Sequence, residues 1–157
     1  MEMNTTKKPL GCFIKGCYTL LKIYLLIFVL YWGFRFLRVQ YMTWYFKTNG
    51  GASVFRNACL KLKPALQESP EKFLSFSKQK FPSEYPMCKL HPQFLSYHET
   101  HGTGINMYVI GITSGFYYSG YIIFESIDNM PSQITLGPPG TIITDIGDGV
   151  FIYQGNN

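Results

Sequence analysis

Apolar and polar positions follow two different patterns along this chain of 157 residues. In the N-terminal part, residues 16–34 are almost continuously apolar, and no charged residue occurs between Ile23 and Phe34. Beyond about residue 93, apolar residues occur in short runs rich in Ile, Val, Tyr and Phe, separated by Gly, Ser, Thr, Asn and Pro. A continuous apolar run predicts one long helix, whereas short runs between turn residues predict β-strands. We therefore expect an α+β protein.

The continuous run predicts a single transmembrane helix over residues 16–47, with its C-terminal part extending into the membrane interface. The charge-free residues 23–34 rise only about 18 Å in a helix, less than a hydrocarbon core of about 30 Å. Including residues 16–22 gives about 28 Å, provided that Lys22 extends its amine toward the headgroups. The aromatic residues typical of an interfacial belt are Tyr31, Trp32, Tyr41, Trp44 and Tyr45.

Three other interpretations of this run are a cleaved signal peptide, a lipoprotein signal ending at Cys12, and a buried helix of a soluble protein. Arg35-Phe36-Leu37-Arg38 stands where a signal peptidase would need small residues. A lipoprotein signal would need an apolar region before Cys12, where the chain has MEMNTTKKP. The shortness of the charge-free core keeps the buried helix open.

We expect residues 1–15 to form a basic cytoplasmic tail and residues 51–157 to form a small domain outside the cytoplasm. The protein would then be a single-pass protein of the inner (plasma) membrane, with a periplasmic or extracellular domain. Lys and Arg differ little in number between the two sides of the helix, so the charge bias alone does not fix the orientation. The expectation rests on the C-terminal position of the folded part and on the similarity to an uncleaved signal anchor.

Residues 53–81 are predicted to be helical. Asn49-Gly50-Gly51 would end the first helix, because glycine tolerates the left-handed conformation of a C-cap. Ser53 would cap a second helix from Val54 to about Lys63, which Pro64 would stop. Ser69-Pro70-Glu71 would begin a third helix that ends near Lys80.

Residues 93–155 are predicted to form an antiparallel sheet of about five strands. The expected strands are FLSYH, INMYVIGI, GYIIFE, TIITDI and VFIYQ, and the last two would form a hairpin around Asp145-Ile-Gly-Asp148-Gly149. Residues 105–124 lack charge and are also long enough for a second transmembrane helix. Their polar residues and glycines favour two strands joined by a Thr-Ser-Gly turn.

The net charge of +5 is the sum of two opposite parts. Residues 1–63 carry +9 (ten Lys/Arg, one acid) and residues 64–157 carry −4 (four Lys, eight acids). No lysine or arginine follows Lys89. Since phosphate backbones are bound by Lys and Arg, we expect no nucleic-acid binding there, whereas a protein partner with a basic surface would be attracted.

The four cysteines are Cys12, Cys17, Cys59 and Cys88. The first two would remain reduced in the cytoplasm, or be acylated in a eukaryotic host. In an oxidising compartment Cys59 and Cys88 are candidates for a disulfide, although sequence cannot show that they lie within bonding distance.

All three histidines lie within residues 88–102 (CKLHPQFLSYHETHG). Cys88, His91, His98 and His101 are candidate metal ligands, since Cys-x-x-His supplies zinc-type donors. His98 and His101 would face opposite sides of a strand, however, and HETHG is one residue short of H-E-x-x-H. We expect a polar turn, no cofactor and no catalytic residues, because no nucleophile motif surrounds these histidines.

The layout of a short tail, one anchor helix and a small external α+β domain resembles, in outline, that of membrane-anchored bacterial immunity proteins, which neutralise toxins in the periplasm. The resemblance covers the layout only and implies a toxin-neutralising role. The aromatic surplus and the acidic C-terminal part favour a non-catalytic protein-binding module, for which a toxin-neutralising role or a part in an envelope complex fits. Two alternatives are a metal-binding membrane enzyme or sensor that uses the 88–101 Cys/His cluster, and an accessory subunit whose helix packs in a membrane complex.

Overall fold

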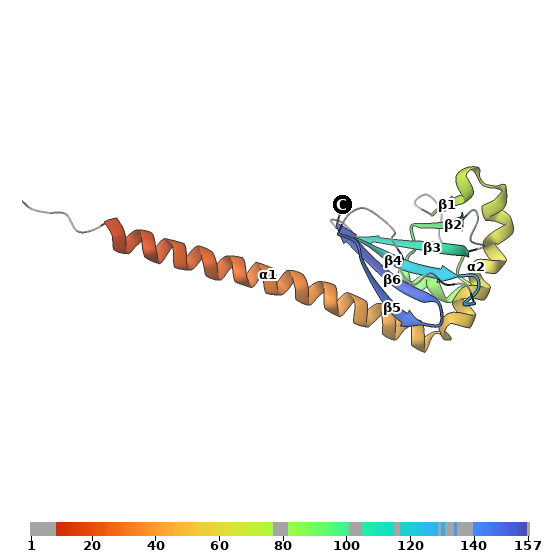
Figure 1. Ribbon diagram of the computed structural model, residues 1–157, viewed down its shortest axis with the longest axis horizontal. Coiled ribbons are helices and arrows are strands. Elements are labelled where there is room, and N and C mark those ends of the chain that lie inside the picture. The colour runs from red at the N-terminus through yellow and green to blue at the C-terminus, as the bar shows by residue number, and fades with distance from the viewer. Residues whose placement is uncertain are drawn as a thin grey trace, which may run out of the picture. The chain divides into compact units, whose positions relative to one another are not determined.

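The computed structural model describes residues 9–76, 82–100, 105–114, 117–128, 130, 134 and 140–156. Helices precede an antiparallel sheet, so the chain is α+β as predicted (Figure 1). The elements in chain order are α1 (Pro9–Thr48), α2 (Gly51–Glu68), the 3-10 turn η1 (Pro70–Lys72), β1 (Phe73–Ser75), the 3-10 turn η2 (Pro86–Leu90), β2 (Phe94–Thr100), β3 (Ile105–Ser114), β4 (Tyr117–Phe124), β5 (Ile142–Gly147) and β6 (Val150–Asn156).

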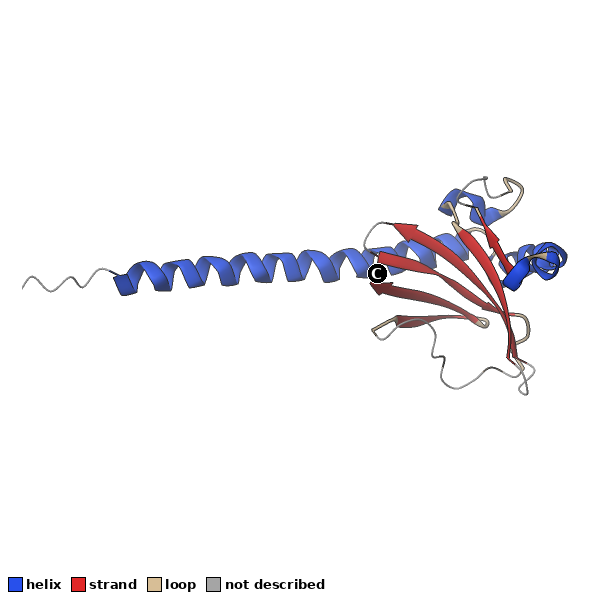
Figure 2. Ribbon diagram, turned by 90° about the horizontal axis from the view of Figure 1, so that it is seen from above, coloured by secondary structure: helices blue, strands red, loops and turns tan. Residues whose placement is uncertain are grey.

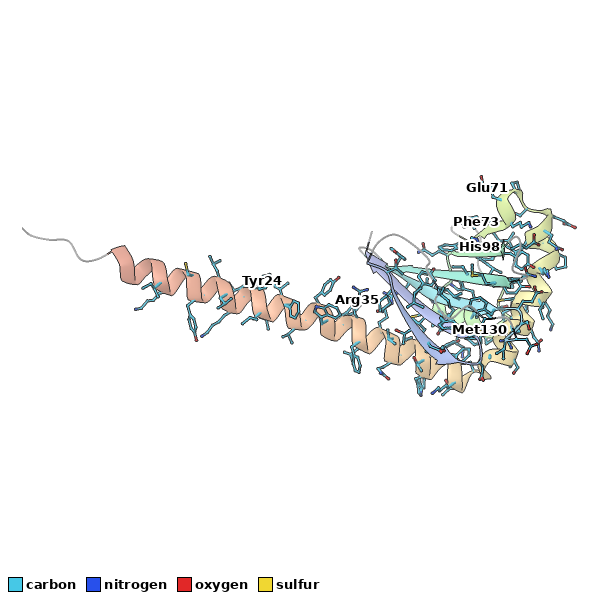
Figure 3. The ribbon with its side chains drawn as sticks, in the orientation of Figure 1. Tyr24, Arg35, Glu71, Phe73, His98 and Met130 are labelled. Carbon is cyan, nitrogen blue, oxygen red and sulfur yellow. The ribbon has the colours of Figure 1, made fainter. Side chains whose placement is uncertain are left out.

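The chain divides into two compact units, residues 1–40 and residues 41–157. The first unit contains most of α1, the one helix in the described part of the chain that is long and apolar enough to cross a membrane, judged by length and composition. The eight consecutive residues 23–30 are each between 48% and 65% exposed, and Tyr24 is drawn among them in Figure 3. Because successive helical residues point about 100° apart, these apolar side chains are exposed on every side of the helix.

The second unit begins within α1, before the domain start predicted at residue 51. Met42, Tyr45 and Phe46 are buried, with exposures of 5% or less. The Tyr121 hydroxyl donates a hydrogen bond of 2.8 Å to the Met42 carbonyl, and the Tyr45 hydroxyl donates to the Pro86 carbonyl. The end of α1 is therefore part of the core of this unit. Tyr45, predicted to face the membrane interface, faces this core instead.

The second helix differs from its prediction at both ends. Gly50, with φ of 97°, precedes α2 as its N-cap residue, and Ser53 lies inside the helix. Pro64 does not stop α2, which continues to Glu68. Proline removes one backbone hydrogen bond from a helix interior, but Leu66 in the following turn is fully buried, and its burial favours continuation of the helix.

The third predicted helix, over residues 69–80, is wrong where the structure describes it. Residues 70–72 form a single 3-10 turn, and Glu71 and Lys72 have φ of 61° and 52°, which do not continue a helix. Residues 73–75 form β1, which pairs antiparallel with β2. Residues 77–81 lie outside the described part of the chain.

The sheet has six strands rather than about five, in the order β1-β2-β3-β4-β6-β5 as labelled in Figure 1, and all neighbours are antiparallel. Figure 2 shows the strands of this sheet in red. The five predicted strands are present, and β1 is the additional one. Residues 105–114 and 117–124 form the paired strands β3 and β4, not a second membrane helix. The predicted β5–β6 hairpin also forms, with Gly147, Asp148 and Gly149 at positive φ.

One face of the sheet packs against α2 and the end of α1. Tyr121 of β4 contacts two helical rings on this face, Phe46 at 6.2 Å and Phe55 at 5.5 Å between ring centroids. Tyr108 of β3 and Ile152 of β6 lie on the same face by register and are fully buried. This is the main hydrophobic core of the unit.

The opposite face carries a second apolar cluster and two ring–glycine pairs. Its buried residues are Ile122, Phe124, Phe151 and Tyr153, with Met130 and Ile134 packed against them. A Cβ at Gly111 would lie 1.9 Å from the Phe94 ring, and a Cβ at Gly155 would lie 2.0 Å from the Tyr118 ring. Each aromatic ring therefore occupies the space above a cross-strand glycine, and both pairs are directly opposed in the sheet register.

Candidate functional site

The candidate metal ligands do not form a cluster among the residues that the structure describes. Cys88 lies in η2 and donates to the Ser83 carbonyl at 3.5 Å, while His91 follows η2 and is exposed. His98 lies on β2, with Nε2 3.0 Å from Ser96 Oγ (Figure 3). His101 lies outside the described residues. Partial desolvation lowers the pKa of His98, so its imidazole is neutral at neutral pH.

Cys59 and Cys88 are both free thiols in the structure, and the disulfide between them stays a prediction for an oxidising compartment. Cys59 is fully buried on the inner face of α2. Burial raises the pKa of its thiol, which makes the reactive thiolate scarce. Cys88 lies in η2 and is partly exposed.

A polar cluster joins α2 to the sheet where β4 ends. Lys63 Nζ donates to Glu125 Oε1 at 2.6 Å. Two tyrosine hydroxyls donate to the same carboxylate, Tyr97 at 3.2 Å and Tyr108 at 3.4 Å. The Asn106 side chain also hydrogen-bonds the Glu125 carboxylate. The backbone carbonyl of Asn106 accepts a hydrogen bond of 2.9 Å from the Glu125 backbone N–H.

The charge state of this cluster follows from these contacts. Burial alone would raise the pKa of Glu125, but the hydrogen bond from Lys63, those from Asn106 and Tyr97, and the charge of Lys63 together hold it below its usual value. The hydrogen bond to Glu125 raises the pKa of Lys63 despite partial desolvation. Both tyrosine pKa values are raised, mainly by burial. At neutral pH the cluster is thus an ion pair flanked by neutral phenols.

A second ion pair lies beside the first. Lys72 of η1 pairs with Glu99 of β2, and the amines of Lys72 and Lys63 lie 5.8 Å and 5.0 Å from the centre of the Tyr97 ring. Each amine is therefore within cation–π distance of this ring. The two pairs fix α2 and η1 to β2 and to the end of β4.

The carboxylate of Glu125 accepts hydrogen bonds from Lys63, Asn106, Tyr97 and Tyr108, which occupy the lone-pair positions available to a carboxylate. A general base needs a free acceptor near a substrate proton. A carboxylate with all acceptors filled serves better as a fixed structural contact, so we interpret the cluster as a connection between helix and sheet.

Arg56 provides a further connection on α2, seven residues before Lys63 and hence on the same side of the helix. Its Nε donates to the Phe124 carbonyl at 2.8 Å, and one terminal nitrogen donates to the Asp148 carbonyl at 2.7 Å. Arg56 thereby connects α2 to the end of β4 and to the β5–β6 turn.

Exposed carboxylates lie near this turn, and we call Asp128, Asp145 and Asp148 the acidic end. The β5–β6 turn and the segment after β4 are adjacent, because a Cβ at Gly149 would lie 3.2 Å from the Met130 sulfur and 3.4 Å from Ile127. All three aspartates are exposed, and Ile127 among them is 50% exposed. In the described part of the chain, the ion pairs are made by Glu125 and Glu99 and not by these three aspartates.

Sequence reasoning missed Arg56, Lys63 and Glu125 as a connected group. Arg56 and Lys63 lie seven positions apart in the sequence, but the sequence pattern predicts that Lys63 is the last residue before a helix stop at Pro64. For Glu125 the pattern predicts only that it ends a strand. The pairing joins residues 62 positions apart, and no local pattern predicts such a contact.

Comparisons of the chain with protein-family models, with curated proteins and with solved structures found no match.

Proposed function

We propose that this chain is a membrane-anchored, non-catalytic protein-binding module whose acidic, β-rich domain lies outside the cytoplasm and binds a partner with a basic surface. The observation that carries the proposal is the contrast between its two units. The first exposes apolar side chains around a whole helix, and the second has a buried apolar core and exposes carboxylates.

The anchor is supported by the exposure of residues 23–30 on all sides of α1. Water-soluble proteins rarely expose contiguous apolar surface of this extent, whereas a bilayer solvates it. The helix also satisfies its backbone hydrogen bonds internally, which is required of a membrane-spanning segment.

A binding role, rather than a catalytic one, is supported by the polar cluster of the domain. Glu125, Lys63 and Tyr97 are engaged with one another in contacts that connect helix and sheet. The exposed acidic end is the remaining charged feature of the β-rich part. Complementary charge speeds association with a basic protein and selects against acidic ones.

The location outside the cytoplasm follows from the proposed topology, in which α1 has its N-terminus inside. A reporter active only outside the cytoplasm, fused after the sheet domain, should be active in intact cells. Activity of a matched cytoplasmic reporter instead would overturn this location.

The binding role is tested by cross-linking and purification of the full chain from native membranes. The wild type should recover one stoichiometric protein partner. Recovery should fall sharply for the triple variant Asp128→Asn, Asp145→Asn, Asp148→Asn. Asparagine keeps the acceptor that Gly147 N–H uses at Asp145 (2.8 Å), and it tolerates the φ of 55° at Asp148.

A matched control removes three exposed acids elsewhere in the domain, by Glu68→Gln, Glu71→Gln and Glu84→Gln. This control should recover the partner as the wild type does. Equal losses of partner in both variants would indicate a general charge effect. Recovery of lipid without protein from the wild type would contradict the binding role.

A further inference from the structure

The charge-free part of α1 is shorter than a membrane, which leaves two alternatives for the membrane-spanning residues. Lys22 and Arg35 bound it, and the residues between them rise about 18 Å. A hydrocarbon core of about 30 Å therefore has to include one of these cations. Nineteen residues, about 28 Å, can run from Gly16 to Phe34, which includes Lys22, or from Ile23 to Tyr41, which includes Arg35 and Arg38.

The contacts of Lys22 are those expected of a cation leaving the membrane on the N-terminal side. Lys22 Nζ lies 4.4 Å from the centre of the Tyr18 ring, one turn earlier in the helix. Side chains on a helix lean toward its N-terminus. An amine near the N-terminal boundary is thus directed outward, toward the headgroups.

For Arg35, the same direction of side chains toward the helix N-terminus points the cation toward the bilayer rather than away from it. Its guanidinium carbon lies 5.7 Å from the Tyr31 ring centre and 5.8 Å from that of Trp32, and it donates to the Tyr31 hydroxyl at 3.2 Å. These partners precede Arg35 in the helix. If the hydrocarbon extended to Tyr41, the guanidinium would be directed toward the middle of the bilayer.

The cost of placing polar groups in the hydrocarbon core also favours the Gly16–Phe34 segment. A lysine or arginine in a membrane helix is most costly at the centre of the bilayer and less costly near its boundary. The Gly16–Phe34 segment encloses one cation, whereas Ile23–Tyr41 encloses two cations and Gln40. The Thr19 hydroxyl, enclosed in the first case, already donates to the Lys15 carbonyl at 3.0 Å.

We propose that the bilayer surrounds Gly16 to Phe34 and that Tyr31, Trp32 and Arg35 form its boundary on the side of the sheet domain. This inference rests on the proposed membrane anchor. Trp44 follows Phe34 by about 15 Å of helix rise, whereas the headgroup layer is about 5–8 Å thick. Tyr41 and Trp44, which are 52% and 59% exposed, therefore belong to the aqueous side and not to the aromatic belt predicted from sequence.

The two tryptophans of the chain, Trp32 and Trp44, make this register measurable. The full chain is reconstituted into phosphatidylcholine vesicles as Trp44→Phe, which retains Trp32, and as Trp32→Phe, which retains Trp44. Fluorescence quenching is compared among vesicles whose acyl chains carry bromine near the headgroup, bromine near the bilayer centre, or no bromine. Co-flotation with the vesicles and far-UV circular dichroism verify insertion and folding of each variant.

We expect Trp32, about 3 Å inside the boundary, to be quenched most by the shallow bromines, and Trp44 to be quenched by neither lipid. Strongest quenching of Trp32 by the deep bromines, with shallow quenching of Trp44, would overturn the register in favour of Ile23–Tyr41. Shallow quenching of both would overturn the aqueous location of Trp44. Absence of quenching at both positions would overturn the membrane anchor itself, so the two failures are distinguishable.

Discussion

Lys63 of α2 and Glu125 at the end of β4 lie 2.6 Å apart and connect the helix to the sheet across 62 positions of sequence. Both side chains are partly buried, with exposures of 26% and 20%. Water screens a partly buried pair less than a surface pair, and the tyrosine hydroxyls around it satisfy the carboxylate further.

Lys63→Met should lower the free energy of unfolding by about 1–2 kcal/mol, since it leaves a charged acceptor without its main donor. Lys61→Met is the matched control, because Lys61 lies on the same helix and is exposed. Its effect should stay within about 0.5 kcal/mol. Urea unfolding of the full chain in one detergent measures both, and equal effects would contradict a specific role for the pair.

The stabilisation by this pair should depend on pH in a defined direction. The pKa of Glu125 is lowered in the folded state, so its contribution is present above the unfolded value of about 4.3 and is lost as pH falls through the folded value. The pKa of Lys63 is raised, so its contribution is present below about 10.4 and is lost as pH rises through the folded value.

Glu125→Gln provides the measurement for this pH dependence. The stability difference between wild type and variant should be constant near neutral pH and shrink below about pH 4.3. A difference that stays constant down to pH 3 would mean that Glu125 titrates no differently in the folded and unfolded chains.

Gly120→Ala should destabilise the domain by more than about 2 kcal/mol through overpacking. A Cβ at Gly120 would lie 1.8 Å from the Ile110 backbone oxygen, and backbone cannot move aside as a side chain can. The control is Gly33→Ala, where no atom lies within 4 Å of the added Cβ. Thermal unfolding followed by circular dichroism should give a lower midpoint for Gly120→Ala and an unchanged one for Gly33→Ala.

Cys59 and Cys88 should react differently with iodoacetamide in the folded protein. Burial and a raised thiol pKa protect Cys59, whereas Cys88 is partly exposed and should be alkylated. After denaturation without a reductant, mass spectrometry should find both alkylated. Protection of both under that condition would mean that they form a disulfide in the native membrane.

Periodic features of this fold were predictable, and features that depend on distant contacts were not. Five strands were recognisable because Ile, Val, Tyr and Phe runs alternate with turn residues. β1 was not, because Phe73–Ser75 is too short to have a period and is defined by its pairing with β2. Ser69-Pro70-Glu71 predicts the start of a helix, and one 3-10 turn forms there. The positive φ of Glu71 and Lys72 ends that turn, and β1 begins at the next residue.

Tyr41 and Tyr45 show that the burial of a single side chain also depends on distant contacts. Tyr41 and Tyr45 are one helical turn apart and equally suited by composition to a membrane interface. The structure leaves Tyr41 52% exposed and buries Tyr45 to 5%. The Tyr45 hydroxyl donates to the Pro86 carbonyl, 41 positions away in the sequence, and such a contact depends on the fold of distant residues.

The strand order β4-β6-β5 affects how the sheet is assembled during synthesis. β1 to β4 can pair successively as they emerge, because each neighbours the strand made just before it. β5 emerges next, but its neighbour in the sheet is β6, which is made later and also covers the edge of β4. A folding state in which β1 to β4 are paired and β6 is not yet added thus leaves one edge of β4 open to aggregation or to a chaperone.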